Sequence, residues 1–239
     1  AVGVDVISDT KNDEYLVASG TSMACPQVAG AAALLTERIR QLGGSFTPRS
    51  DVLKTLMING ATDIGIPGPD FRFGFGFLNV ERSLIMLDSN RYFTNTVNNG
   101  AQVTHNITVP PGTGQLKITL CWHDVAASPL ATTQLVNDLD LVVSEPGGAL
   151  HKPLVLDPSP ANINNPAIEK EDRLNNTEQV VIQNPAAGIY TAMVKGYSLL
   201  SGSRNYVLAY TFLPQGIHVK YTLANSTGNA ADSVYVYWG

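Results

Sequence analysis

Near its start the chain carries the eleven residues Gly20-Thr21-Ser22-Met23-Ala24-Cys25-Pro26-Gln27-Val28-Ala29-Gly30. An apolar run, residues 31–35, follows directly. A serine in front of such a run predicts the start of a helix, because its hydroxyl oxygen accepts an unpaired N–H group of the first turn. Pro26 fits that first turn, where a missing N–H costs nothing. Taken alone, the pattern indicates a capped helix and no more.

The complete string resembles the nucleophile segment of the subtilisin-like serine proteases. Gln27 is the one departure, since many members of that family carry His at this position. The resemblance implies that Ser22 is the nucleophile and that Gly20 and Thr21 lie beside the oxyanion and the substrate. Met23 either fills a gap in the core or borders the leaving-group side of the site. The backbone N–H of Ser22 and the dipole of the following helix would stabilise the oxyanion.

A serine nucleophile needs a histidine base, and that base needs an aspartate to fix its tautomer. In the family both precede the serine, whereas the residues before Ser22 include Asp5, Asp9 and Asp13 but no His. All four histidines come much later, at positions 105, 123, 151 and 218. The resemblance therefore implies that an upstream segment of a longer precursor supplies the Asp, the His and the oxyanion-hole Asn. We expect the chain alone to be catalytically incompetent.

Two other readings of this region are weaker. Cys25 as a thiol nucleophile lacks a nearby His, and a small buried packing residue is the more common use of Cys in a helix. Gly74 and Gly76 suggest a nucleotide-binding loop, but the third glycine and the following helix of such a loop are missing. The string from Gly74 to Val80 is instead similar to the last block of subtilisin-like domains.

Hydrophobic periodicity predicts the elements around Ser22. Strands are expected at 2–7 and 15–18, a helix at 22–41, a helix ending at Gly60 that Thr47 caps, a strand or hairpin at 71–80, and a short helix through Leu87 that Asn79 caps. The first helix is apolar all round in its first half, which is typical of a helix inside a domain. The resemblance thus covers residues 1–89, as an α/β fragment: the C-terminal third of a subtilisin-like parallel-sheet domain.

After residue 90 the spacing of the hydrophobic residues changes from the helical period to strict alternation with polar residues. Turns rich in Gly, Pro and Asn separate the short alternating segments. This pattern predicts an all-β antiparallel sandwich or jelly roll over residues 90–213. The expected strands are 103–109, 116–122, 139–143, 179–182, 189–195 and 206–212. The strings at 121–124 and 135–141 resemble the β-sandwich domain of certain bacterial alkaline subtilisin-like proteases. Residues 214–239 are expected to be a truncated further domain or an added hairpin, with strands at 217–223 and 234–238.

Asp138 and Asp140 lie two residues apart on an expected strand, so their side chains share one face. A solvated strand face is one reading. The other is a structural calcium site with Asp124 and Asn137 as further ligands, because hard cations bind clustered carboxylate and carbonyl oxygens. A glycosidase pair of carboxylates is a third reading, without sugar-binding aromatics to support it. No cofactor is expected for catalysis.

Composition excludes several classes of function. The net charge is -5 without a basic block, which argues against nucleic acid as a partner. No apolar run is long enough for a membrane span. The two cysteines fix no disulfide framework. The leading interpretation is the nucleophile-bearing C-terminal portion of a secreted or cell-surface subtilisin-like endopeptidase that acts on protein or peptide substrates. The alternative is a non-catalytic β-sandwich module, for binding or structure, with an idle serine.

Overall fold

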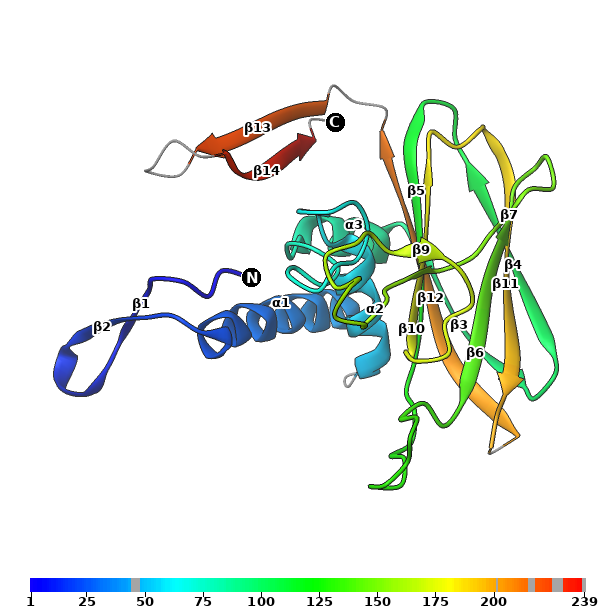
Figure 1. The fold of residues 1–239 in the computed structure, drawn as a ribbon, viewed down its shortest axis with the longest axis horizontal. Coiled ribbons are helices and arrows are strands. Elements are labelled where there is room, and N and C mark those ends of the chain that lie inside the picture. The colour runs from blue at the N-terminus through cyan, green and yellow to red at the C-terminus, as the bar shows by residue number, and fades with distance from the viewer. Residues whose placement is uncertain (44–47, 201, 215–217, 225–229, 238–239) are drawn as a thin grey trace.

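The structure of the 239-residue chain is a computed structural model. It describes residues 1–43, 48–200, 202–214, 218–224 and 230–237, with side chains up to Pro214. An N-terminal hairpin, three helices and a two-layered β unit follow one another across the molecule (Figure 1). The described part is mostly β, with antiparallel sheets and few helices.

The β unit comprises residues 92–214 and contains two four-stranded antiparallel sheets. The first sheet has the order β10 (Thr177–Gln183), β5 (Thr113–Trp122), β12 (Ser203–Pro214), β3 (Tyr92–Asn98). The second has the order β4 (Gln102–Val109), β11 (Gly188–Ser198), β6 (Asp138–Ser144), β7 (Leu150–His151). A separate short pair joins β8 (Leu154–Val155) to β9 (Ile168–Glu169).

The period-two alternation of the strands builds the core between the two sheets. Apolar side chains from both sheets, among them Leu120, Trp122 and Leu141, are buried in one cluster. Trp122 also donates its indole N–H to the backbone oxygen of Asn137 at 2.8 Å, so its one polar atom is satisfied. The antiparallel β character predicted for residues 90–213 is confirmed, and all six expected strands form.

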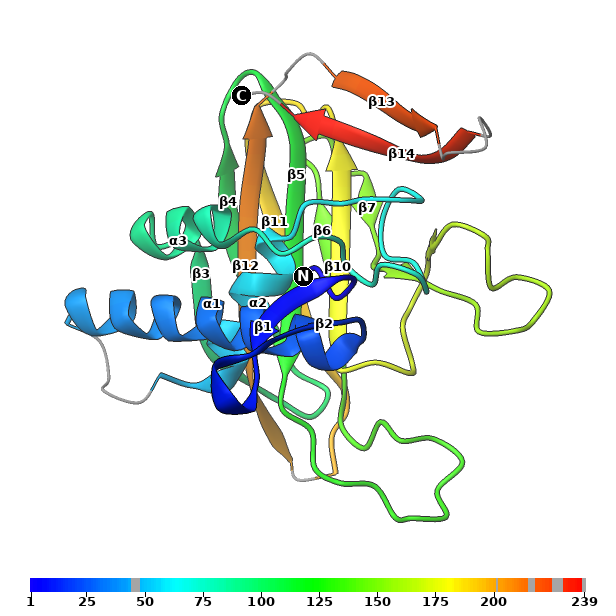
Figure 2. The ribbon, with the colours of Figure 1, turned by 90° about the vertical axis from the view of Figure 1, so that its left-hand side faces the viewer.

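The helices α2 (Ser50–Gly60) and α3 (Val80–Asp88) pack on the outer face of the first sheet, and α1 (Thr21–Gln41) packs against these two helices (Figure 2). Strand β12 is buried on both faces, because Leu208 points into the core between the sheets while Val207 joins a second core with Leu35 and Leu56 of the helices. The helices and the β unit are therefore joined by a hydrophobic core on the outer face of β12.

Polar side chains of β5 complete this junction. Lys117 donates to the backbone oxygen of Ala61, the C-cap residue that follows α2, at 2.7 Å. The hydroxyl of Thr119 donates to the side-chain oxygen of Asn59 at 2.8 Å. Burial lowers the pKa of Lys117 to about 8. The end of α2 is thus held by a buried amine from the sheet.

The N-terminal hairpin consists of β1 (Val6–Asp9), a single helical turn at Lys11–Asp13, and β2 (Tyr15–Ala18). The two strands pair antiparallel, and no parallel ladder forms within the described part of residues 1–89. A parallel pair needs a crossover connection of a dozen or more residues, which the short link between β1 and β2 cannot provide. The expected strand at 2–7 begins only at Val6, and β2 lies where it was predicted.

Several expectations for the helical part need correction. The first half of α1 is largely exposed, and Cys25 is exposed instead of buried. The reason is that no described segment covers that half of the helix. Residues 71–80 form turns with isolated bridges in place of a regular hairpin. The predicted cap Thr47 lies outside the described residues, and α2 begins at Ser50.

Other elements agree with the sequence or were missed by it. The side chain of Asn79 accepts the backbone N–H of Arg82 at 3.0 Å, so the predicted cap of α3 is confirmed. Strand β3 was not predicted, because Tyr92–Asn98 is rich in Asn and Thr. Two further strands, β13 (His218–Ala224) and β14 (Ala230–Tyr237), pair antiparallel close to the two that were expected.

Candidate functional site

Ser22 occupies the first turn of α1, directly after the Gly20-Thr21 turn. Gly20 has φ 156 and ψ 167, a backbone conformation that is almost restricted to glycine. Its carbonyl oxygen accepts the N–H of Met23 at 3.1 Å and so opens the helix. Its own N–H donates to the oxygen of Gly3 at 2.6 Å. A Cβ on Gly3 would lie 2.7 Å from the oxygen of Gly20, so this close approach requires glycine there.

Gln27 holds the N-terminal segment against the same helix through two hydrogen bonds. Its amide nitrogen donates to the backbone oxygen of Val2 at 2.7 Å, and its oxygen accepts the N–H of Val2 at 3.2 Å. Sequence reasoning registered Gln27 only as a departure from the family pattern and missed this contact. A side chain with both a donor and an acceptor is the signal that could have suggested it, because it can bind both polar groups of one residue.

The side chains of Thr21 and Ser22 are exposed, whereas Met23 is half-buried. Within the described residues the hydroxyl of Ser22 has no hydrogen-bond partner. Helix α1 presents its N-terminus at this point, where backbone N–H groups and the positive end of the helix dipole favour a developing negative charge. The turn therefore offers an accessible hydroxyl next to an environment suited to an oxyanion.

Each histidine with a described side chain has a hydrogen-bond partner other than Ser22. His105 lies 2.7 Å from the hydroxyl of Tyr206 inside the β unit, and burial lowers its pKa. His123 lies 2.9 Å from the hydroxyl of Ser50, and His151 lies 2.9 Å from a carboxylate oxygen of Glu145. The side chain of His218 lies outside the described residues. None of the three described histidines meets Ser22.

The comparisons with known proteins fall on this part of the chain. Residues 5–76 match the model of the Subtilase family. A 73-residue stretch is 41% identical to the "Extracellular serine protease" of Serratia marcescens and covers 30% of this chain and 6% of that protein. A stretch of 81 residues is 37% identical to "Subtilisin DY" of Bacillus licheniformis and covers 34% of this chain and 26% of that protein.

One relative matches beyond the subtilase segment. The "Serine protease/ABC transporter B family protein tagA" of Dictyostelium discoideum is 24% identical over 223 residues, which cover 84% of this chain and 12% of that protein. The chain thus spans only a small part of the curated relatives that it matches. Together the matches place the segment around Ser22 in the subtilase family, a family of serine proteases.

No helix in the described residues is long and apolar enough to cross a membrane.

The predicted calcium ligands divide into two separate groups. Asp124 and Asn137 bind each other, since the side-chain amide of Asn137 donates to Asp124 at 2.7 Å. Burial alone would raise the pKa of Asp124, but hydrogen bonds from Asn137 and from backbone amides lower it. Asp138 and Asp140 instead face Arg173, whose guanidinium contacts both carboxylates. The four residues therefore do not converge on one point.

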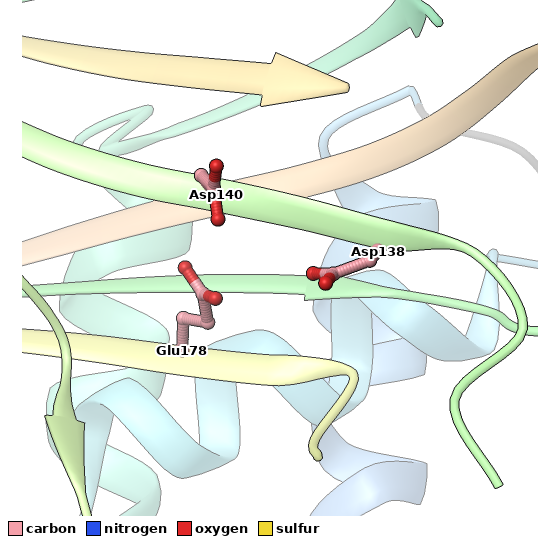
Figure 3. A group of neighbouring side chains, drawn as sticks. All are labelled: Asp138, Asp140 and Glu178. Carbon is pink, nitrogen blue, oxygen red and sulfur yellow. The ribbon is translucent and has the colours of Figure 1, made fainter. Parts of the chain in front are cut away.

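Glu178 on β10 joins Asp138 and Asp140, and sequence reasoning did not single it out (Figure 3). Burial raises the pKa of Glu178 well above its ordinary value. Burial also raises the pKa of Asp138 to about 6, against the opposing charge of Arg173. The signal available in the sequence was one charged residue within the otherwise uncharged strand Thr177–Gln183.

Proposed function

We propose that this chain is the nucleophile-bearing C-terminal portion of a secreted subtilisin-like serine endopeptidase. The observation that carries the proposal is the exposed Ser22 at the N-terminus of α1, within the segment that matches the Subtilase family. In this reading Ser22 Oγ attacks the peptide carbonyl and forms an acyl-enzyme. The backbone N–H of Ser22 and the helix dipole stabilise the oxyanion that develops.

The hydroxyl of Ser22 requires a base to become a nucleophile at neutral pH. The three histidines with described side chains have other partners, which supports a base and an orienting aspartate from a segment upstream of residue 1. The chain by itself is then inactive toward peptides. In this proposal substrate preference also depends on that segment.

Exposed apolar side chains support the upstream segment as a partner. Ile7, Leu16 and Val17 of the hairpin are each more than half exposed, and so is Leu34 of α1. Single exposed apolar residues are ordinary, but a group of them on adjoining elements indicates a surface that another part of the protein covers. The missing portion of the catalytic domain would cover it and bring the base close to Ser22.

We also infer that the β unit is a jelly roll that stabilises the catalytic part. Support comes from the strand order, since successive strands from β3 to β6 alternate between the two sheets and β10 to β12 do so again. The buried contact between α2 and strands β5 and β12 gives the unit its stabilising role. The extracellular serine protease among the relatives supports secretion.

A fluorophosphonate probe, which reacts with activated serines, tests the proposal. It is applied to the 239-residue chain and to the longer polypeptide that carries the family's Asp and His segments, and labelled peptides are found by mass spectrometry. We expect labelling of Ser22 in the longer polypeptide only. Ser22→Ala abolishes it, and Ser8→Ala, at an exposed serine of β1, leaves it unchanged.

Two results would contradict the proposal. An unlabelled Ser22 in the longer polypeptide favours a binding or structural module with an idle serine. Peptide hydrolysis by the 239-residue chain alone, lost in Ser22→Ala, shows that this chain needs no upstream base.

A further inference from the structure

A cavity of about 300 Å³ lies between the helical part of the chain and the β unit. One wall is formed by α2 and the turn at residues 69–75, and the other by the segment from β8 to the first residue of β10. A volume of this size is at the lower end of the range for small-molecule sites, which occur preferentially where two parts of a protein meet. We call it the junction cavity.

Two buried aspartates hold the walls of the junction cavity in place. Asp70 is 5% exposed, and both of its oxygens accept backbone N–H groups of neighbouring residues. Asp172 is 2% exposed, and both of its oxygens accept N–H groups of residues that follow it. The turn before Asp70 also contacts the segment that begins at β8, since a Cβ on Gly68 would lie 2.9 Å from the side chain of Leu154. The cavity is therefore preformed, and its two acids are covered.

Lys54 of α2 supplies the charge that the cavity presents to a ligand. Among the described lining residues it is the only cation, and its side chain is half-buried. No described residue forms a hydrogen bond or an ion pair with its amine. A cation that is partly removed from water is stabilised by an anionic partner, and the covered aspartates do not provide one.

We propose that the junction cavity binds a small apolar carboxylate, with its charged end at Lys54 and its apolar end against Ile58, Phe75 and Leu156. These three side chains line the cavity together with Lys54. A single amine balances the one charge of a carboxylate, whereas a phosphate group carries up to about two charges near neutral pH. Either the free C-terminus of a short apolar peptide or a free fatty acid has this chemistry.

Calorimetric titration of the 239-residue chain with two probes tests the proposal. Sodium octanoate represents a fatty acid, and N-acetyl-leucyl-leucine with a free carboxylate represents a peptide C-terminus. We expect one molecule per chain of at least one probe, and the probe that binds more tightly identifies the source of the ligand. Octanamide and the amide of the peptide keep the shape but lose the charge, so they should bind at least ten-fold more weakly.

Substitutions then separate the charged end of the cavity from its apolar end. Lys54→Gln should weaken binding of the acids at least ten-fold, and Phe75→Ala, which removes part of the apolar wall, should weaken it several-fold. Lys195→Gln is the matched control, because it removes the same charge from an exposed lysine of β11 that does not line this cavity. It should bind like the unmodified chain. Thermal unfolding of each variant confirms that it is folded.

Three results would overturn the proposal. In the first, neither acid binds to the unmodified chain. In the second, the amides bind as tightly as the acids, so the cavity does not recognise the charge. In the third, Lys54→Gln binds the acids as tightly as Lys195→Gln does. None of these results depends on whether Ser22 is catalytic, because labelling of Ser22 is measured separately.

Discussion

The N-terminal region and the β unit are both rich in apolar residues, yet they use them differently. The β unit buries its apolar side chains between two sheets, with Leu120 and Leu208 at 0% exposure. The N-terminal hairpin and the first half of α1 leave theirs in contact with solvent, with Leu16 at 58% and Val28 at 37%. The contrast shows that one region has a closed core whereas the other has apolar side chains that no described residue covers.

The contact between the two regions explains why the exposed first half of α1 still has a defined position. The second half of α1 contributes Leu35 and Ile39 to a core with α2, α3 and the outer face of β12. The first half extends beyond that core, and within the described residues Gln27 joins it to the N-terminal segment through two hydrogen bonds to Val2. Ser22 is therefore on a rigid helix whose surroundings are incomplete.

The largest difference between the regions should appear in matched leucine substitutions. Leu120→Ala leaves a cavity in a closed core and should lower the free energy of unfolding by about 2–5 kcal/mol. Leu34→Ala removes an exposed side chain and should change it by less than about 0.5 kcal/mol. Urea unfolding of both variants measures the difference. Equal losses would mean that the exposed face of α1 at Leu34 is as well packed as the core of the β unit.

The second prediction concerns the junction and its dependence on pH. Lys117 has a pKa of about 8 in the folded protein, below its ordinary value of 10.5, because it is buried. Between these two values the unfolded chain binds the proton that the folded chain has lost, so stability should rise with pH. The rise amounts to at most about 1.4 kcal/mol per pH unit.

Lys117→Met should remove this contribution and flatten the rise between pH 8 and pH 10. Lys152→Met, at a solvent-exposed lysine, serves as the control and should keep it. The measurement is urea unfolding at each pH for all three proteins. If the difference in stability between Lys117→Met and the unmodified chain does not change with pH, Lys117 does not titrate as a buried amine.

Much of this organisation could be predicted from the sequence, for reasons that differ between the regions. The strands of the β unit follow from alternation, because each has one face in a core. The helix after Ser22 and the cap at Asn79 follow from local hydrogen bonding that the sequence displays directly. The exposure of α1 could not be predicted, because an apolar helix pattern indicates a buried face without saying which segment covers it.

The acidic cluster could be predicted only in part. Asp138 and Asp140 share a strand, so their common face follows from the period of two. Glu178 reaches them through the packing of two sheets and Arg173 from the segment between β9 and β10, and no local pattern gives that pairing. Asp124 and Asn137 are close to the pair in sequence, but their side chains satisfy each other instead.

A smaller effect is expected at the cap of α3. Asn79→Ala removes the acceptor for the N–H of Arg82 and should lower the free energy of unfolding by about 1 kcal/mol. Asn79→Asp keeps an acceptor oxygen and should retain most of the stability. Thermal unfolding of the two variants provides the test, and an equal loss in both would argue against the capping contact.

The smallest effect is expected at Gln27. Gln27→Ala removes two hydrogen bonds to Val2 at an exposed position, so the free energy of global unfolding should change by less than about 0.5 kcal/mol. Hydrogen exchange at Gly20, whose N–H donates to Gly3, should nevertheless become faster. Unchanged exchange there would show that Gln27 does not hold the N-terminal segment against the helix.

The most direct test of the account is hydrogen exchange measured by mass spectrometry on two proteins. One is the 239-residue chain, and the other is the longer polypeptide with the Asp- and His-bearing segments of the family. We predict that residues 6–34 exchange much more slowly in the longer polypeptide, while β5 and β12 exchange equally in both. Equal exchange of residues 6–34 in the two proteins would contradict the claim that the rest of a catalytic domain covers the exposed face around Ser22.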